Sequence, residues 1–272
     1  MFRSLPLYAN LLSFLVVTLV NSSSHGVKGQ EKKQLPPYLA HSHAHNDYEH
    51  PQPLIDSLAL GFASIETDVW LVDGKLCVAH DRSDVDPNRR LENMYLDPLL
   101  DRFNQNAKKL FSNGETLVLL IDFKSEGATT YEALKKLLEK YRPMLLASAE
   151  MPTPSLKIII SGNRPVDIIA KDKSRLVFMD GRLKDLQNKI DPSLMPWISD
   201  NWRLHFRYMG SGTISAEERQ KLRDYVSRVH ASGAQLRFWA TPENEALWKV
   251  LREESVDFIG TDQLERLSNF LK

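Results

Sequence analysis

The segment ASIETDVWLVDGKLCVAH, residues 63–80, contains the strongest fold signal in the chain. Its first part, Ala63–Trp70, is predicted to form a strand. The pair Asp73-Gly74 is typical of a two-residue hairpin turn, which sends the chain back along that strand. Glu66 and Asp68 stand two residues apart, so their carboxylates point to the same face of the strand. The segment therefore predicts a hairpin whose first strand carries two acidic groups on one side.

Strand and helix patterns alternate on both sides of this hairpin. The run LVLLIDF, residues 117–123, is apolar and bounded by polar residues, which suits a strand buried on both faces. The other strands are expected at Leu39–His45, Lys75–His80, Leu156–Ile160, Leu176–Met179, Met195–Ser199, Gln235–Trp239 and Val256–Gly260. The helices are expected at Pro53–Gly61, Asp97–Ser112 and Tyr131–Tyr141, from a Ser215/Glu218 capping box to Gly233, from Thr241-Pro242, and at Gln263–Leu271.

This alternation predicts the fold class. About eight strand–helix units in roughly 235 residues match the repeat of a (β/α)8 TIM barrel. Strands that alternate with helices form a parallel sheet covered by those helices, which is the α/β class. A doubly wound open sheet is the alternative, but no glycine-rich phosphate loop follows the first predicted strand. We therefore expect the barrel.

The composition excludes several classes of protein. The chain has 272 residues, of which 42% are hydrophobic, and this excludes a disordered or collagen-like chain. Its 35 basic and 35 acidic residues give a formal charge of zero, which argues against nucleic acid as a partner. The one cysteine, Cys77, excludes an internal disulfide and a cysteine-based zinc cluster.

The N-terminal segment has the layout of a secretory signal. Residues 1–26 contain the basic Arg3, an apolar stretch from Leu7 to Val20 and then small residues, so we expect a signal peptide and an exported protein, secreted or periplasmic. An uncleaved membrane anchor is the alternative. Residues 27–37 are polar and are expected to be a linker, which leaves residues 38–272 as a single barrel domain.

Acidic residues concentrate where a barrel places its reactive groups, at the C-terminal ends of the strands. Glu66, Asp68 and Asp122 would repel one another there. One divalent cation with oxygen ligands, Ca²⁺ or Mg²⁺, would relieve this repulsion. Lys124 and a nearby arginine would instead neutralise the acids as a structural ion-pair network. The residues alone leave both interpretations open.

The histidines are unevenly distributed. Of eight, four fall within ten residues, at His41, His43, His45 and His50. His45 ends the first strand and His80 ends the hairpin, so together they could take and give a proton in the cleavage of a phosphodiester. The alternation His41-Ser42-His43-Ala44-His45 supports a rival, an amidohydrolase-like hydrolase with zinc ligands. That site needs histidines at later strand ends, and after His80 only His205 and His230 remain.

Three blocks of residues stand at these strand ends: His45-Asn46-Asp47-Tyr48, Glu66-Thr67-Asp68-Val69-Trp70 and Val78-Ala79-His80-Asp81. Together they resemble the phospholipase C-like phosphodiesterase superfamily of TIM barrels. This superfamily includes phosphoinositide phospholipases, glycerophosphodiester phosphodiesterases and sphingomyelinase D. The string from Ala44 to Asp81 looks most like the branch of altered inheritance of mitochondria protein 6 homologues.

The resemblance implies a role for each of these residues. His45 and His80 become the catalytic acid–base pair. The ligands of the cation become Asn46, Glu66, Asp68 and Asp122. Lys124 resembles a lysine that contacts phosphate. Weaker agreement with glycerophosphodiesterases appears at Arg237-Phe238-Trp239 and at Gly260-Thr261-Asp262.

The implied activity is that of a metal-dependent phosphoric diester hydrolase acting on a glycerophosphodiester or phospholipid-type substrate. Asn46-Asp47 replaces the Arg-Gly that usually follows the first histidine of glycerophosphodiesterases, and Asp122 replaces their usual Glu, so the substrate stays open. An exported barrel that binds a metal or a phospholipid without turnover is the alternative. The expected partner is a small-molecule or lipid phosphodiester, with transient membrane-surface contact and no protein partner implied.

Aromatic residues near strand ends give weaker signals. Trp70 and Trp239 could line a substrate pocket or belong to the core, and we assign Trp239 to substrate binding. Residues 201–212, NWRLHFRYMGSG, are either a lid over a lipid head group or a loop that covers the barrel with apolar anchors.

Overall fold

The structure is a computed structural model that describes Met1 and residues 35–146, 155–188 and 191–272. The predicted signal peptide and most of the predicted linker lie outside the described residues. The described residues from 35 onward form one compact unit. None of the helices in the described part of the chain has the length and apolar character needed to cross a membrane.

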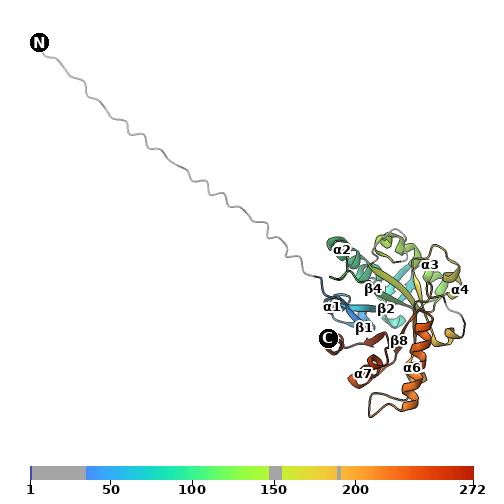
Figure 1. The fold of residues 1–272 in the computed structure, drawn as a ribbon. Helices are drawn as coiled ribbons and strands as arrows, with labels where there is room; N and C mark the ends of the chain where they lie inside the picture. The colour runs from blue at the N-terminus through green and yellow to red at the C-terminus, as the bar shows by residue number, and fades with distance from the viewer. Residues whose placement is uncertain (2–34, 147–154, 189–190) are drawn as a thin grey trace. The chain divides into compact units, whose positions relative to one another are not determined.

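Eight parallel strands close into a barrel, as the sequence predicts. Strand β1 pairs with β2 on one side and with β9 on the other, which closes the ring. The barrel strands are β1 (Leu39–Ala44), β2 (Phe62–Val72), β4 (Leu117–Phe123), β5 (Leu156–Gly162), β6 (Phe178–Gly181), β7 (Trp197–Asn201), β8 (Gln235–Trp239) and β9 (Phe258–Thr261). Figure 1 shows the strands in the middle of the domain with the helices around them.

The predicted hairpin is confirmed at the end of β2. Strand β3 (Lys75–Val78) runs antiparallel to β2, with Val69 opposite Val78. Asp73 and Gly74 have φ angles of 48° and 74°, the left-handed pair that a type I′ turn requires. The hairpin lies outside the ring of parallel strands, and it brings the residues after β3 back to the end of β2.

The helices that cover the barrel differ in length. They are α1 (Ile55–Leu60), α2 (Asp97–Gln105), α3 (Gly127–Leu138), α4 (Val166–Lys171), α5 (Trp202–His205), α6 (Ala216–Ala231), α7 (Glu245–Glu253) and α8 (Leu264–Leu271). Short 3-10 turns occupy Asp47–Glu49, Arg82–Asp84, Glu139–Met144 and Leu183–Gln187, and a π-helical turn, Glu92–Leu96, precedes α2.

Three helix predictions were wrong at their ends. The helix expected over Tyr131–Tyr141 is α3, which begins at Gly127 and ends at Leu138. The helix expected over Asp97–Ser112 stops at Gln105, because Ala107 and Lys108 adopt positive φ angles of 53° and 65°. The helix expected from Thr241-Pro242 begins at Glu245, where the Asn244 side chain accepts a hydrogen bond from the backbone N–H of Leu247 at 2.8 Å. The side chain that caps the helix, rather than the proline, sets its first residue.

Only half of the predicted capping box forms at α6. The hydroxyl of Ser215 accepts a hydrogen bond from the backbone N–H of Glu218 at 3.2 Å. The carboxylate of Glu218 instead accepts hydrogen bonds from the backbone N–H groups of Arg207 and Tyr208. Residues 201–212 are thereby fixed to α6, and their aromatic side chains Trp202, Phe206 and Tyr208 are buried. The segment is a covering loop with apolar anchors.

The barrel interior changes character along its length. Val118 and Leu120 of β4 pack inside the barrel with Trp197 and form an apolar floor. Leu119 and Ile121 belong to the larger core, which lies mainly between the strands and the helices. Because side chains alternate along a strand, the next inward residue after Leu120 is Asp122. The floor is therefore apolar, and the inward row ends in a polar group at the C-terminal end of the strand.

Candidate active site

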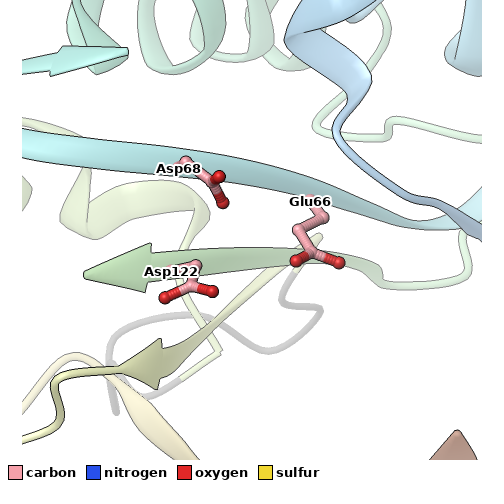
Figure 2. Close-up of side chains that lie close together, drawn as sticks. All are labelled: Glu66, Asp68 and Asp122. Atoms are coloured by element: carbon pink, nitrogen blue, oxygen red, sulfur yellow. The ribbon is translucent and has the colours of Figure 1, made fainter. Parts of the chain in front are cut away.

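Three carboxylates meet at the C-terminal ends of β2 and β4. Asp68 lies directly opposite Asp122 in the parallel register of these strands. Glu66 precedes Asp68 by two residues, so it lies one step deeper on the same face. One oxygen from each of the three groups lies within 4.8 Å of the others. Figure 2 shows the three side chains, which we call the acidic trio, turned toward the same space.

Two cations compensate the trio in part. Lys124 Nζ lies 3.1 Å from Asp68 Oδ2 and 3.2 Å from Asp122 Oδ2. Arg237 donates to Glu66 Oε2 at 2.8 Å. The ion-pair network considered from the sequence is therefore present, but two cations leave one carboxylate in excess. Burial, reinforced by Asp68 and Glu66 and opposed by Lys124, raises the pKa of Asp122 to about 6.

The remaining oxygens fit a divalent cation. Asp68 and Asp122 use Oδ2 for Lys124, and Glu66 uses Oε2 for Arg237. Asp68 Oδ1 is buried and has no hydrogen-bond partner among the described residues. A buried carboxylate oxygen without a partner is costly unless something positive binds it. An all-oxygen set of this kind suits Mg²⁺ or Ca²⁺. Across the part of the chain that the structure describes, these acids are the group arranged to hold a metal.

His80 lies beside the trio, after β3. Its Nδ1 is 3.0 Å from Asp68 Oδ2 and 3.3 Å from the hydroxyl of Tyr48, which donates to the same Asp68 oxygen at 2.7 Å. Its side chain is 53% exposed. With Nδ1 held by Asp68, Nε2 is the nitrogen that can exchange a proton with a bound molecule. Sequence reasoning missed Tyr48 as a partner, although it belongs to the first of the three blocks.

His45 follows β1 on the other side of the trio. Its Nδ1 lies 2.7 Å from Oδ1 of Asp262, which follows β9, the neighbour of β1. Burial works against the charged imidazole, but the hydrogen bond to Asp262 and the nearby Glu66 outweigh it and raise the pKa of His45. The same hydrogen bond lowers the pKa of Asp262. His45 thus stays protonated to higher pH than an ordinary histidine.

The alternating histidines do not converge, so the zinc interpretation was wrong. His41 has a φ of 67°, and the register of β1 against β2 shifts between Leu39 and His43, which breaks the alternation. The Nδ1 of His41 bonds to the backbone oxygen of Asp257 at 2.8 Å. The buried His43 lies between Ser64 at 2.8 Å and Glu66 at 2.7 Å, and burial with the nearby Arg237 lowers its pKa to about 3. His43 is therefore a neutral imidazole that orients Glu66.

A cavity of about 430 Å³ opens over these groups, and we call it the catalytic cavity. Its lining residues are His45, Asn46, Glu66, His80, Asp122, Lys124, Ser161, Arg182, Ser199, Arg237, Trp239 and Ala240. Asn46 has a left-handed backbone with φ 44°, and Trp239 is 38% exposed. Trp70 is not among the lining residues, and its indole N–H donates to the backbone oxygen of His80 at 3.3 Å.

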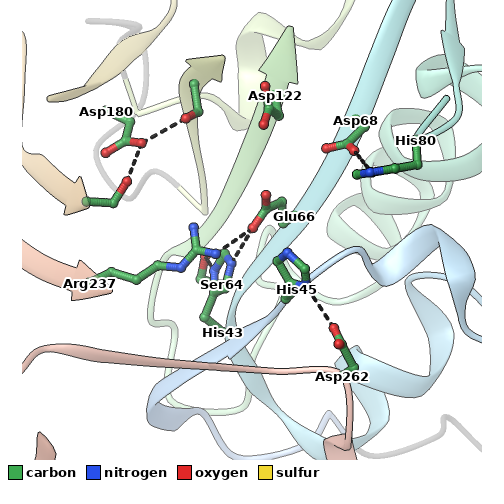
Figure 3. A network of polar contacts seen from close by, with 12 residues as sticks. His43, His45, Ser64, Glu66, Asp68, His80, Asp122, Asp180, Arg237 and Asp262 are labelled. Atoms are coloured by element: carbon green, nitrogen blue, oxygen red, sulfur yellow. Dashed lines mark hydrogen bonds and ion pairs between the residues drawn. The ribbon is translucent and has the colours of Figure 1, made fainter. Parts of the chain in front are cut away.

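Figure 3 shows a polar cluster across the cavity that the sequence did not reveal. The buried Asp180 of β6 accepts hydrogen bonds from Ser161 at 2.8 Å, from Ser199 at 2.6 Å and from Arg182 at 2.5 Å. These residues stand at the ends of short strands, where an Asp or a Ser alone carries no recognisable spacing. The one available signal was that the acidic Asp180 directly follows the apolar run Leu176–Met179.

Comparisons with known proteins agree with this geometry. A sequence model described as the AIM6-like phosphodiesterase domain matches residues 32–180. The protein altered inheritance of mitochondria protein 6 of Eremothecium gossypii is 28% identical over 275 residues, covering 86% of this chain and 70% of that protein. A homologue from Arthroderma benhamiae is 27% identical over 266 residues, covering 84% of this chain and 82% of its own length.

Two solved structures share the fold. A glycerophosphodiester phosphodiesterase from Parabacteroides distasonis matches 86% of this chain and 98% of its own, with a TM-score of 0.51 and 17% identity. A phosphodiesterase from Oleispira antarctica, solved in complex with the product sn-glycerol-3-phosphate, matches 87% of this chain and 97% of its own, with a TM-score of 0.50 and 15% identity.

Proposed function

The chain belongs to the AIM6-like phosphodiesterase family, and from this premise we propose that it hydrolyses a glycerophosphodiester or phospholipid-type substrate with the help of one divalent cation, Mg²⁺ or Ca²⁺. The observation that carries the proposal is the position of two histidines on either side of the acidic trio in one cavity. A zinc hydrolase would not explain this trio, and a barrel that only binds would not need the two positioned imidazoles.

The cation would be held by Asn46, Glu66, Asp68 and Asp122. When bound, such a cation stabilises the negative charge that develops on the phosphoryl oxygens. The trio carries one carboxylate more than Lys124 and Arg237 neutralise, and this excess favours a divalent ion. Lys124 lines the cavity beside Asp122, so its ammonium group can contact a phosphate oxygen there.

The two histidines divide the proton transfers. One imidazole takes the proton of the attacking hydroxyl, and the other gives a proton to the oxygen of the leaving alcohol. Asp262 holds the ring of His45 and Asp68 the ring of His80, each through Nδ1. Among the described residues, neither Nε2 atom has a hydrogen-bond partner, so each can exchange a proton with the substrate. Water as the nucleophile gives hydrolysis directly, whereas a substrate hydroxyl next to the phosphate gives a cyclic phosphate first.

We also propose that the protein is exported and touches a membrane surface only transiently. The layout of residues 1–26 supports export. Leu204 and Met209 follow β7, Trp239 ends β8, and the exposed side chains of all three would meet such a surface. Trp239 also lines the cavity, where its indole can pack against the substrate.

The proposal is tested by assaying the purified protein on glycerophosphodiesters and lysophospholipids, with a chelator and with Mg²⁺ or Ca²⁺ added back. We expect turnover that the chelator abolishes and the metal restores. His80→Ala should lower kcat by roughly a hundredfold to ten-thousandfold, the usual contribution of a positioned acid or base, while metal binding stays. His230→Gln is the matched control, because His230 pairs with Asp257 outside the cavity. Full turnover in His80→Ala would refute the assignment.

A further inference from the structure

A second groove lies next to the catalytic cavity. Its volume is about 600 Å³, and we call it the outer groove. Its lining residues are Tyr48, Glu49, His50, Pro51, Pro53, Ala79, His80, Asp84, Arg89 and Met94. His80 lines both the outer groove and the catalytic cavity. The outer groove is thus separated from the catalytic cavity by one of the two proposed reacting side chains.

The position of His80 at this boundary is fixed. Its Nδ1 is held by Asp68 and lies near the hydroxyl of Tyr48, and Tyr48 itself lines the outer groove. A phosphodiester carries two esterified alcohols, which we call its arms. When the phosphate is bound beside the trio, the protein must accommodate both arms. The catalytic cavity of about 430 Å³ has to hold the phosphate as well as one arm. The larger space beyond His80 is open to the other arm.

The lining of the outer groove indicates which arm would fit. Its walls include the apolar side chains of Pro51, Pro53 and Met94. Two carboxylates, Glu49 and Asp84, line the groove together with one guanidinium, that of Arg89. Nη2 of Arg89 already donates to the backbone oxygen of Tyr48 at 2.6 Å. The excess of negative charge disfavours an arm that is itself anionic.

We propose that the outer groove is a substrate subsite that holds the second alcohol arm of a glycerophosphodiester, an arm without negative charge. The glycerol arm stays in the catalytic cavity with the phosphate. The inference rests on the proposed function, and it adds a selection rule: the second alcohol is bulky and is uncharged or cationic.

The test uses diesters of sn-glycerol 3-phosphate that differ only in the second alcohol, which is methanol, cyclohexanol or 4-carboxycyclohexanol. Met94→Trp and Asp84→Trp fill the outer groove from its wall and from its rim. Ile168→Trp is the control, because Ile168 of α4 is exposed and lines neither the outer groove nor the catalytic cavity. The readout is kcat/KM from the loss of substrate, with thermal unfolding to show that each variant is folded.

Both filling variants should lower kcat/KM for the cyclohexyl diester at least tenfold and change the methyl diester less than twofold. The wild type should prefer the cyclohexyl to the carboxycyclohexyl diester at least fivefold. Equal losses on the methyl and cyclohexyl diesters, or no loss in either folded variant, would overturn the subsite. So would a preference for the anionic arm.

Failure of the proposed function gives a different result. In that case the wild type consumes none of the diesters, and calorimetric binding of the cyclohexyl diester replaces turnover as the readout. Binding that Met94→Trp weakens tenfold and Ile168→Trp leaves unchanged would support the outer groove as a ligand site without hydrolysis. Binding that is absent, or that Met94→Trp does not change, would remove the subsite as well.

Discussion

The two halves of the barrel contribute differently to the catalytic cavity. The first half, from β1 to β4, supplies the residues proposed to react or to bind the cation: His45, Asn46, Glu66, Asp68, His80, Asp122 and Lys124. The second half supplies partners that hold these groups, chiefly Arg237 at β8 and Asp262 after β9. Arg237 reaches Glu66 across 171 residues of sequence, and Asp262 reaches His45 across 217.

The two halves therefore separate the residues proposed to react from the residues that position them. A residue that reacts is defined by its own side chain, whereas a supporting residue acts by setting the charge and orientation of another one. Loss of a supporting residue should therefore change stability or a pH profile before it abolishes turnover. The predictions that follow apply this distinction to single residues of the second half.

The largest effect on stability is expected at Arg237. Arg237→Met removes the guanidinium from the buried Glu66, and breaking a buried ion pair from one side costs about 3–5 kcal/mol of unfolding free energy. Urea unfolding in the presence of a chelator measures it. The control is Arg223→Met on α6, whose side chain is 54% exposed and pairs with Glu254. We expect a smaller loss there, because Arg223 is exposed to solvent and Arg219 still pairs with Glu254. Equal losses in the two variants would contradict the role of Arg237.

The loss of unfolding free energy in Arg237→Met also depends on pH. Burial alone would raise the pKa of Glu66, but Arg237 and His43 outweigh it and hold the pKa below the ordinary carboxyl range. A depressed pKa contributes stability that is present above the unfolded value of about 4.3 and is lost as the pH falls through the native value. The difference in unfolding free energy between the wild type and Arg237→Met should therefore be greatest at neutral pH and should decrease below about pH 4.

How much the sequence could predict follows the same division. Glu66 and Asp68 share a strand face, and His45, His80 and Asp122 stand at strand ends. The two-residue alternation of a strand and the positions at strand ends were therefore enough to predict that these residues lie in one site. The barrel followed from the alternation of strands and helices. These are local signals, each contained within a few residues of chain.

The supporting contacts could not be predicted because they depend on which strands become neighbours when the ring closes. That Asp262 would meet His45 follows only from the pairing of β1 with β9. The three alternating histidines diverge because His41 has a positive φ angle. No pattern of residue types in the sequence predicts that angle. The cluster around Asp180 joins three separate strands and was invisible for the same reason.

A smaller effect, on activity, is expected at Asp262. Asp262→Asn keeps the shape of the side chain but removes the charge that raises the pKa of His45. A charged hydrogen bond worth about 2.5 kcal/mol becomes a neutral one worth about 1 kcal/mol. The loss of about 1.5 kcal/mol should lower kcat/KM about tenfold. Because the pKa of His45 falls, its limb of the pH profile should move to lower pH.

The measurement is kcat/KM against pH, with an NMR titration of the His45 ring. His230→Gln serves as the matched control, since it breaks a His–Asp pair of nearly equal length, 2.8 Å against 2.7 Å, outside the cavity. Its profile should coincide with that of the wild type. A profile of Asp262→Asn that is lowered but not displaced would show that Asp262 only orients the ring and does not set its charge.

The smallest effect is expected at Ser215, which supports the fold without reaching the cavity. Ser215→Ala removes the hydroxyl that accepts from the backbone N–H of Glu218 at the start of α6, and such a cap is worth about 1 kcal/mol. The melting temperature should fall by about 2–4 °C, with kcat/KM unchanged. Ser232→Ala at the other end of α6 is the control, because the Ser232 hydroxyl only donates to the backbone oxygen of Val229. A loss of activity in Ser215→Ala at a temperature where the variant is folded would show that α6 and the loop it fixes through Glu218 also shape the cavity.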